Sequence, residues 1–562
     1  MQPVWKIEPA NPQRASTLAR EAGIDPITAQ LLLNRGVTTR AEVQRFFTPR
    51  LDALEDPMTL PDMAKAVARI RRAAANGEPI LIFGDSDVDG LTASVILHEV
   101  LRGLGAHVRT RSANRIADGY GLPASLVRQL CRSGTKLVIL VDCGTNQPDA
   151  VRSLKAHGID TMIIDHHVPL EEWAEPVALV NPHCGQGPGR ELCSAGLAFR
   201  TAQALLAGDA EERAHDYLDL AALGTLADCS PLRGQSRILV SSGLERLVRS
   251  PREGLRRLCE ATGTVQPDPE QVVRRLVPRL NASGRLGNPE AVWHLLRRDA
   301  QQAPDAWLAA AESAHAELKQ LHRQTLGQAQ EQINRLHFRD QYVLVVSREG
   351  WPQGLMGSLA SLITERYGRP AIAIAMRQRR GVGSGRSVPL YDLLSALKRC
   401  QRWLLAFGGH AQACGLTLNV RHLESFRALV NRDAQEQLGR EGLLRTQRMD
   451  LELRLSAVEA AWVRELERFS PFGHGNPRPS IVIRRLTIET TSPRTGWVTD
   501  GSRRVRIKGV LPTVPGACYD VAAHPVLLEG EPVLMVSGAK VSTGLSAPSR
   551  TSGTSYTRVS AS

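Results

Sequence analysis

The sequence predicts an α/β protein: a parallel sheet flanked by helices, a long connecting helix, a second α/β domain and a C-terminal β-barrel. Between residues 79 and about 230, short apolar runs alternate with amphipathic helical patterns, which is typical of a parallel sheet covered on both faces. Strand, helix and strand patterns return at 342–346, 358–367 and 371–375. Residues 479–540 are rich in strand patterns, as in a small barrel.

Length and composition limit the class of protein. The 562 residues allow several domains, and 42% hydrophobic with 23% charged residues is typical of a globular chain. No stretch approaches the roughly 20 apolar residues that span a bilayer, and residues 1–10 lack a signal-peptide core, so we expect a cytoplasmic protein with no membrane association. The nine cysteines form no CxxC pair, and His183, Cys184 and Cys193 lack a fourth ligand, so neither a zinc knuckle nor a disulfide framework is indicated.

The formal net charge is +13, which favours a polyanionic partner. Arginine supplies most of the positive charge, and its planar fork suits phosphate groups. Charge alone therefore favours nucleic-acid binding, although arginine-rich composition also has other origins.

Elements are expected in the following order. Residues 1–60 form a helical lead-in, with helices at 26–36 and 39–47, the second capped by Thr38 or Thr39. Apolar residues at helical spacing predict a helix over 62–76. In the first domain, 61–300, the expected strands are 80–83, 108–110, 136–141, 161–164 and 178–180, and the expected helices are 91–103, 123–132 and 148–157.

Three carboxylates follow the first strand. Asp85, Asp87 and Asp89 alternate between Gly84 and Gly90. Acids this close repel one another when ionised, and a folded protein keeps such a cluster mainly where a hard cation compensates the charge. The alternative is a solvated Asp-rich turn, and further ligands at later strand ends would decide between the two.

Such ligands recur. Asp142 follows the strand 136–141, Asp165-His166-His167 follow 161–164, and Asp228 ends the helical run 218–227. Parallel strands bring their carboxyl ends to one sheet edge, so these side chains can converge. Oxygen donors with one or two imidazoles suit Mn²⁺ or Mg²⁺, and this many carboxylates favour two ions sharing a bridging aspartate.

Four blocks carry a family resemblance: Gly84-Asp-Ser-Asp-Val-Asp-Gly90, Val141-Asp-Cys-Gly144, Asp165-His-His167 and Gly224-Thr-Leu-Ala-Asp228. In order and spacing they resemble the four motifs of the DHH phosphoesterase superfamily. Further blocks at 114–122, 278–286, 383–387, 408–415 and 471–477 resemble the RecJ type, across roughly residues 18–540. The resemblance implies a DHH domain, a DHHA1 domain over 339–440 and an OB-fold over 441–545.

The resemblance also implies a function, namely 5′→3′ exonuclease action on single-stranded DNA, which releases 5′-mononucleotides in DNA repair and recombination. Two Mn²⁺ or Mg²⁺ ions would be held by Asp85, Asp87, Asp142, His166 and Asp228, with Asp142 as the best candidate bridge. Asp165, His167 and Asp89 would act beside the ions, and the sequence leaves open which histidine binds metal. Single-stranded DNA is the expected partner, with a single-strand-binding protein and a helicase as further candidates.

Substrate contacts are expected outside the metal blocks. The candidates are Asn114, Arg115, Arg279, Asn281, Arg285, Ser384, Arg386, Gly409, His410, Arg503 and Arg506. The arginines of the first two domains lie beside or near Gly or Asn, where a tight backbone leaves the guanidinium free for phosphate; for each, a surface arginine or ion pair is the alternative. The DHHA1 candidates are expected in glycine-rich loops.

The second half of the chain is expected to extend this surface. Residues 301–338 contain a helix that we interpret as a spacer. In the barrel, Arg504, Arg506 and Lys508 alternate along one strand and face outward, as on an OB-fold that follows a single strand or on a solvated strand face. Residues 546–562 are rich in Ser, Thr and Gly and are expected to be disordered.

Three residues depart from the family pattern. Ser86 stands where an aromatic residue is usual, Val88 replaces an alanine, and Pro352 replaces the histidine of the Trp-His-x-Gly segment. Two other functions remain open: a DHH phosphodiesterase for oligonucleotides or cyclic dinucleotides, and a non-catalytic single-strand-binding scaffold. The basic barrel favours a polymer over a small substrate, and the retained acids favour catalysis over a scaffold.

Overall fold

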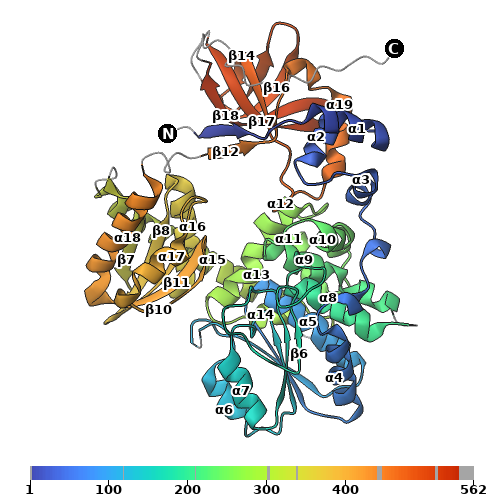
Figure 1. Cartoon of the computed structure of the whole chain (residues 1–562), viewed down its shortest axis with the longest axis vertical. Helices are drawn as coiled ribbons and strands as arrows, with labels where there is room; N and C mark the ends of the chain where they lie inside the picture. Colours follow the sequence, from blue (N-terminus) through green and yellow to red (C-terminus); the bar gives the residue numbers. More distant parts are fainter. Residues whose placement is uncertain are drawn as a thin grey trace. The chain divides into compact units, whose positions relative to one another are not determined.

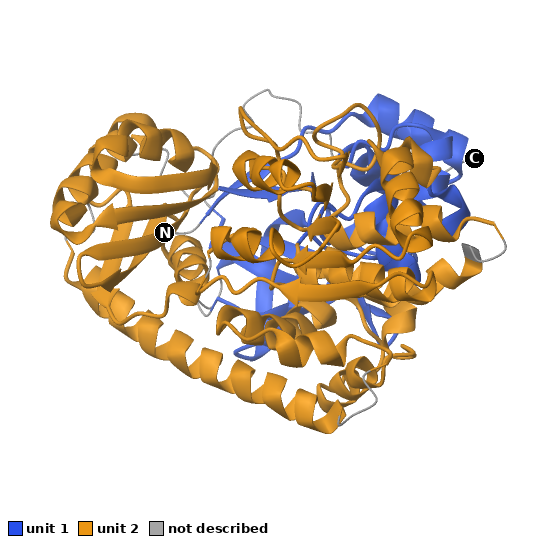
Figure 2. Ribbon diagram, turned by 90° about the horizontal axis from the view of Figure 1, so that it is seen from below, with its two compact units in different colours: residues 1–54, 229–242, 446–562 blue, residues 55–228, 243–445 orange. Residues whose placement is uncertain are grey.

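The computed structural model describes residues 3–117, 119–208, 211–299, 304–336, 340–439, 446–512 and 517–542 (Figure 1). The chain divides into two compact units, coloured in Figure 2: residues 1–54, 229–242 and 446–562 form one, and residues 55–228 and 243–445 the other. The predicted disordered tail lies outside the described residues. Within those residues, no helix is both long and apolar enough to cross a membrane.

The second unit contains a five-stranded parallel sheet in the order β3-β2-β4-β5-β6. Its strands are β2 (Ile80–Gly84), β3 (Val108–Ser112), β4 (Leu137–Val141), β5 (Asp160–Ile164) and β6 (Ala178–Val180). Every residue of β4 is buried, because helices cover both faces of the sheet. The predicted parallel sheet flanked by helices is confirmed.

Helices on the two faces bury alternate residues of the strands. Phe83, Leu140 and Ile163 share a core with α6 (Ala124–Leu130) and α7 (Pro148–Ala156). On the other face, α5 (Val88–Gly103), α8 (Ser194–Leu206) and α9 (Leu218–Ala227) pack against one another, and α4 (Met63–Ala75) packs against α8 and β6. The same unit contains α11 (Glu253–Ala261), α12 (Pro269–Gln271), a π-helix (Val272–Leu276), α13 (Val277–Arg285) and α14 (Glu290–Leu295), while α10 (Gly234–Leu247) begins in the first unit and ends in the second.

The register of the sheet places three aspartates side by side. Gly84 pairs with Val141, and Val141 pairs with Ile164, so β2, β4 and β5 end at the same level. The next residue of each strand continues the ladder: the Asp85 amide donates to Val141 O (3.2 Å) and the Asp142 amide to Ile164 O (3.0 Å). Asp85, Asp142 and Asp165 therefore leave the sheet at one edge.

A long helix, α15 (Pro304–Asn334), precedes a second α/β domain. Its sheet has the order β10-β11-β9-β8-β7, and only β7 and β8 pair in parallel. Its elements are β7 (Leu344–Glu349), α16 (Met356–Tyr367), β8 (Ala371–Arg377), β9 (Arg380–Arg386), α17 (Leu393–Arg399), β10 (Leu404–His410), β11 (Ala413–Asn419) and α18 (Leu423–Leu438). The expectation of glycine-rich loops was wrong: Ser384 and Arg386 lie in β9, and Gly409 and His410 in β10. Glycines in these strands admit neighbouring side chains, as at Gly383, where an added Cβ would lie 2.8 Å from Ile374.

The first unit contains a closed five-stranded barrel. Its strands β14 (Ile481–Ser492), β15 (Thr495–Thr499), β16 (Arg504–Gly509), β18 (Glu531–Val541) and β17 (Cys518–Leu528) pair in this order, and β17 pairs back with β14. The parallel β16–β18 pairing and the 1-2-3-5-4 order are those of an OB-fold, which confirms the predicted barrel. Beside it lie β13 (Leu451–Glu452), α19 (Ala460–Leu466) and the N-terminal helices α1 (Pro12–Ala22), α2 (Pro26–Leu33) and α3 (Arg40–Phe47).

The N-terminal segment differs from the expected all-helical lead-in. It begins with a strand, β1 (Val4–Ile7), which pairs in parallel with β12 (Thr446–Met449). Leu31 and Leu32 of α2 share a core with Val463 of α19 and Ile481 of β14. The first 54 residues thus fold with the C-terminal barrel in one unit, a pairing across the chain that no local pattern reveals.

A buried ion pair fastens the helices of the second unit. Arg252, fully buried before α11, lies 2.8 Å from Glu99 of α5 and 3.3 Å from Asp219 of α9. We expect Arg252→Met to destabilise this unit by about 3–5 kcal/mol, because it removes the charge partner of the buried Asp219 and leaves Glu99 with Arg298 alone. Urea unfolding and hydrogen exchange of α5 and α9 measure the effect.

The matched control lies on the same helix. Arg257 pairs with Glu253 and Asp305 at the surface, so Arg257→Met should leave the unfolding midpoint close to that of the parent. Equal midpoints for both variants would contradict the role given to Arg252.

Candidate active site

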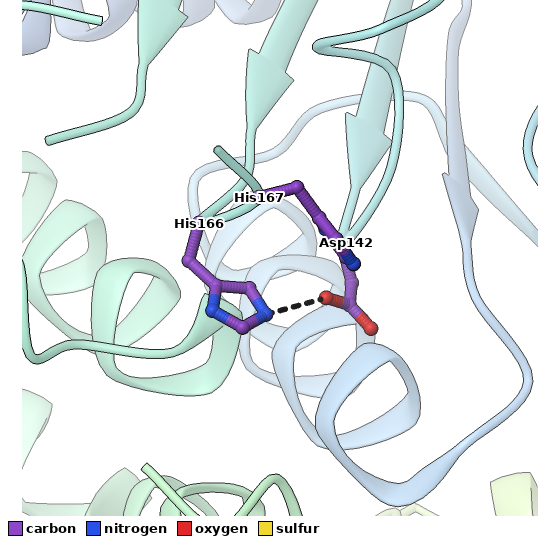
Figure 3. A group of neighbouring side chains, drawn as sticks. All are labelled: Asp142, His166 and His167. Carbon is purple, nitrogen blue, oxygen red and sulfur yellow. Dashed lines mark ion pairs between the residues drawn. The ribbon is translucent and has the colours of Figure 1, made fainter. Parts of the chain in front are cut away.

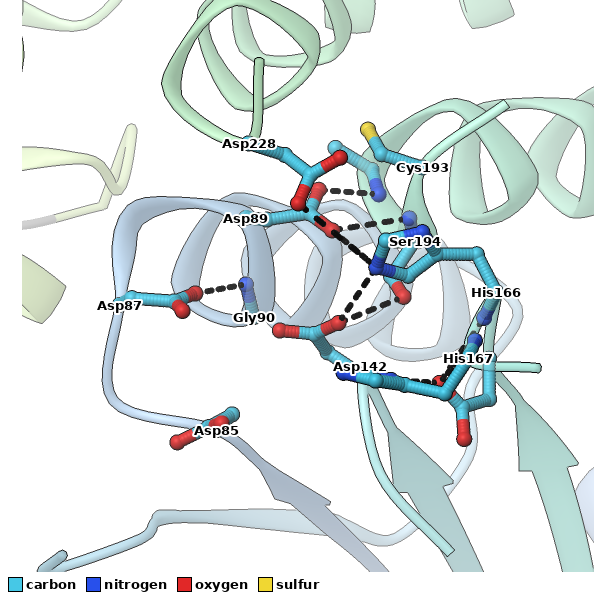
Figure 4. Close-up of polar contacts among 12 residues, drawn as sticks. Asp85, Asp87, Asp89, Gly90, Asp142, His166, His167, Cys193, Ser194 and Asp228 are labelled. Atoms are coloured by element: carbon cyan, nitrogen blue, oxygen red, sulfur yellow. Dashed lines mark hydrogen bonds and ion pairs between the residues drawn. The ribbon is translucent and has the colours of Figure 1, made fainter. Parts of the chain in front are cut away.

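The acids of the four sequence blocks meet at the carboxyl edge of the parallel sheet. Asp85 is 1% exposed and Asp142 is 3% exposed. Asp142 has a φ of 59°, which is rare for a residue with a side chain and turns the chain sharply at the end of β4. The strained position directs its carboxylate toward the other acids rather than along the strand (Figure 4).

His166 faces the centre of this cluster. Its Nε2 lies 3.4 Å from Asp142 Oδ1, and 3.8 Å from both Asp89 Oδ2 and Asp228 Oδ1. The dashed line in Figure 3 marks the contact with Asp142. Asp228 comes from the C-terminal end of α9, so a strand end and a helix end approach the same imidazole. Sequence alone left open which histidine points inward, and the geometry places His166 there.

Asp165 supports the two histidines from beneath. Its Oδ1 accepts the amides of His166 (2.8 Å) and His167 (3.2 Å) and contacts His167 Nδ1 at 2.7 Å. The Thr145 amide binds its other oxygen at 3.2 Å. Burial alone would raise the pKa of Asp165, but these bonds, led by that of His167, hold its pKa well below the usual range.

Asp89, in the first turn of α5, fixes the start of another helix, α8. Its two oxygens accept the amides of Ser194 (2.9 Å) and Ala195 (2.8 Å), at the start of α8. A carboxylate is favourable there because the first amides of a helix lack partners. The Ser194 hydroxyl in turn donates to Asp142 Oδ1 at 3.0 Å, so α8 holds both acids in place.

The titration of the cluster reflects burial and mutual repulsion. Burial and the neighbouring charge of Asp228 raise the pKa of Asp89 to about 6. Burial and the charge of Asp89 raise the pKa of Asp142 well above its usual value, and burial raises that of Asp85. Burial alone would lower the pKa of His166, but the hydrogen bond to Asp142 and the surrounding carboxylates raise it. The cluster therefore lacks positive charge.

This deficit and the donor set fit divalent hard cations. Among the described residues there are three groups whose ligand atoms lie within 4.8 Å of one another: Asp85 with Asp87 and Asp142, Asp89 with His166 and Asp228, and Asp142 with His166 and His167. Asp142 belongs to two groups, as a bridging ligand would. Carboxylate oxygens with an imidazole suit Mn²⁺ or Mg²⁺.

A cavity of about 750 Å³ adjoins the acids. On one side it is lined by Asp87, Asp228 and Arg285, and on the other by Ser384 and Arg386 of the second α/β domain. Arg115 and Tyr120 also line it, and the Tyr120 hydroxyl lies 3.3 Å from His167 Nδ1. Cations thus face the cavity from both domains, which suits a phosphate-bearing ligand.

Two predicted substrate residues bind backbone groups, Asn281 in the acidic loop and Asn114 in its own segment and at Gly287. The Asn281 side chain accepts the Val88 amide at 3.0 Å. Asn114 accepts the amides of Ile116 (3.2 Å) and Ala117 (3.0 Å) and donates to Gly287 O (3.0 Å). Asn281 also lines the cavity, whereas Asn114 does not.

The other candidates lie outside the cavity lining. Arg279 is paired with Glu312 of α15 at 2.6 Å. Gly409 and His410 end β10, and neither residue lines the cavity. Arg503 and Arg506 belong to the barrel unit, where Arg506 pairs across the strands with Trp497. A substrate role for these residues stays a prediction.

Sequence reasoning missed several supporting residues. Gly284 of α13 approaches the acidic loop so closely that an added Cβ would lie 2.3 Å from Ser86 O. Ser194, Thr145 and Tyr120 each bind a member of the cluster. The glycine stood in a block singled out above; the serine and threonine carry no local signal, because only the fold brings them near.

Comparisons with known proteins follow the same domain order. Residues 79–225 match the DHH family N-terminal domain, 340–436 the DHHA1 domain and 449–496 the RecJ OB domain. The chain is 34% identical over 488 residues to the single-stranded-DNA-specific exonuclease RecJ of Dickeya dadantii, covering 80% of this chain and 82% of that protein. The chain belongs to the RecJ family.

Other members of the RecJ family give the same result. The single-stranded-DNA-specific exonuclease RecJ of Bacillus subtilis is 33% identical over 493 residues, 86% of this chain and 62% of that protein. The chain thus spans less than two thirds of that relative. The structure of RecJ in complex with Mn²⁺ from Thermus thermophilus superimposes with a TM-score of 0.82 at 26% identity, over 96% of this chain and 80% of that one.

The close approach of Gly284 to the acidic loop can be tested by substitution. We expect Gly284→Ala to displace the Ser86 carbonyl and to weaken Mn²⁺ binding about tenfold. A tenfold loss corresponds to about 1.4 kcal/mol, within the range of about 1–3 kcal/mol that overpacking of a core typically costs. Isothermal titration measures it. Gly327→Ala on α15, where an added Cβ meets no atom within 4 Å, is the control and should bind Mn²⁺ like the parent.

Metal binding by the acidic cluster should depend on pH. The raised pKa values of Asp85, Asp89 and Asp142 mean that the folded protein keeps protons on these carboxylates to a higher pH than an unfolded chain, and a metal must displace them. Mn²⁺ should therefore raise the melting temperature more at about pH 8 than at about pH 5.5. Equal shifts at both pH values would contradict the assignment, and Asp142→Asn should reduce the shift at both.

Proposed function

We propose that the protein is a metal-dependent exonuclease that hydrolyses single-stranded DNA from the 5′ end. The observation that carries the proposal is that the acids of all four blocks converge around His166 in a chain of the RecJ family. The family's named members are single-stranded-DNA-specific exonucleases, and repair and recombination would be the processes served.

Five residues would hold the ions: Asp85, Asp87, Asp142, His166 and Asp228. Two bound Mn²⁺ or Mg²⁺ ions would supply an activated water and neutralise charge on the phosphodiester. Asp142 groups both with Asp85 and Asp87 and with the two histidines, and it is the proposed bridge between the ions. Asp165 orients the histidines, while Asp89 anchors α8 and the Ser194 hydroxyl that binds Asp142.

His167 occupies the boundary between the cluster and the cavity. It is held by Asp165, and Tyr120 of the cavity wall contacts its ring. We assign His167 to the reacting phosphate rather than to a permanent ligand position. Arg285, Ser384 and Arg386, which line the cavity, would grip the strand and its terminal phosphate.

The barrel would supply a binding surface of its own for a polymer. On its outer face Trp497 neighbours Arg506, and Thr495 neighbours Lys508. Basic and aromatic side chains on the second and third strands of an OB-fold suit single-stranded nucleic acid. A single-strand-binding protein and a helicase are proposed as partners on the family resemblance, and the cytoplasm is proposed as the location from the apolar pattern of the sequence.

Direct assay of strand polarity tests the proposal. With Mn²⁺, a single-stranded oligonucleotide labelled at its 5′ end should release labelled mononucleotide first, while a 3′-labelled one should not. Asp142→Asn should lower the rate by about three orders of magnitude or more, because it removes a ligand that belongs to two of the three candidate groups.

Two other results would change the assignment. Turnover restricted to dinucleotides or cyclic dinucleotides would identify a small-substrate phosphodiesterase. Binding of single strands with no release of nucleotide at any metal concentration would identify a scaffold. Full activity in Asp142→Asn would contradict the site itself.

A further inference from the structure

Arg115 lines the cavity, and its guanidinium also binds two carboxylates of the acidic cluster. Its Nε donates to Asp85 Oδ1 at 2.8 Å, and its Nη2 donates both to Asp85 Oδ2 and to Asp87 Oδ2, the latter at 3.1 Å. The guanidinium thus grips one carboxylate with both arms of its fork and touches the next. These are the two carboxylates that group with Asp142 as candidate metal ligands.

The bonds of Asp85 leave little capacity for another partner. Each carboxylate oxygen offers about two lone-pair sites. Oδ1 already accepts the Ser86 amide (2.6 Å) and Arg115 Nε, and Oδ2 accepts Arg115 Nη2. Asp85 is 1% exposed, so solvent adds no alternative. A cation that used both Asp85 and Asp87 would compete with the guanidinium for these oxygens.

Arg115 itself is partly exposed to solvent. Its side chain is 46% exposed, in contrast to the carboxylate it binds, and it lines the cavity together with Arg285 and Arg386. A guanidinium released from Asp85 would remain beside these two cations. It would then be available to a phosphate in the cavity, for which its fork is well suited.

We propose that Arg115 is an exchangeable counter-ion: it neutralises Asp85 and Asp87, gives up these carboxylates to the metal, and then serves as a phosphate ligand in the cavity. The exchange rests on the proposed function, because it needs a metal at these acids. Its consequence is reciprocal coupling: metal strengthens phosphate binding, and a phosphate that captures Arg115 strengthens metal binding by the same factor.

Metal titration tests the exchange without turnover. In Arg115→Met, Mn²⁺ should bind about tenfold more tightly at one of its sites, since a charge-assisted competitor is removed. Arg115→Lys, which keeps the charge but not the fork, should also tighten Mn²⁺ binding, to a smaller extent, and serves if the methionine variant folds poorly. Isothermal titration calorimetry and the electron paramagnetic resonance spectrum of Mn²⁺ report the affinities.

A matched control separates exchange from general electrostatics. Arg285 lines the same cavity, and its charge is close enough to Asp87 to interact, but no hydrogen bond joins it to Asp85 or Asp87 in the described residues. Arg285→Met should leave Mn²⁺ affinity within about twofold of the parent. An equal gain in Arg285→Met and Arg115→Met would overturn the exchange.

Coupling to phosphate provides the second readout. For a phosphorothioate oligonucleotide with a 5′-phosphate, Mn²⁺ should tighten binding to the parent about tenfold more than to Arg115→Met, within the usual range of coupling between sites. Arg386→Met should weaken binding but keep the Mn²⁺ effect. Unchanged Mn²⁺ affinity in Arg115→Met, or undiminished coupling, would overturn the exchange alone, whereas a parent that binds no Mn²⁺ would overturn the proposed function as well.

Discussion

The mutual repulsion of carboxylates at one sheet edge is the constraint on which the rest of this structure depends. Because β2, β4 and β5 end in register, Asp85, Asp142 and Asp165 leave the sheet as neighbours, all nearly buried. Burying several like charges is costly unless each gains a partner. The surrounding elements can be understood as the set of partners that make this edge stable.

Each partner arrives from a different part of the fold. The first amides of α8 bind Asp89, and the Arg115 guanidinium binds Asp85 and Asp87. The His167 ring contacts Asp165, and the His166 ring faces Asp142. These bonds stabilise the acids without using every lone pair around Asp142, so the edge keeps the capacity for cations that the donor set favours. The same arrangement of acids thus accounts both for the contacts that stabilise this edge and for its capacity to bind cations.

The metal-bearing half was predictable because its signals are local. An apolar run followed by an acid identifies a strand end, and parallel pairing then brings the acids together without knowledge of the register. The N-terminal strand β1 was not predictable, since its partner β12 lies more than 400 residues away. The family resemblance implied glycine-rich loops where the structure has β9 and β10. In these strands Gly383 leaves room for Ile374 and Leu416, and Gly409 for the backbone of Ala413, contacts that only the fold reveals. The paired Arg279 and the loop-holding Asn281 show the same limit: sequence identifies a polar residue but not its partner.

Two departures from the family pattern become understandable at this level of detail. Ser86 and Val88 differ from the usual residues, yet the loop is held through their backbone atoms. The Ser86 amide binds Asp85, its carbonyl lies against Gly284, and the Val88 amide binds Asn281. The Val88 carbonyl accepts the Thr92 hydroxyl at 2.7 Å. Since the acids are positioned by main-chain contacts, the side chains between them can change while the carboxylates keep their places, provided that Gly284 and Asn281 remain.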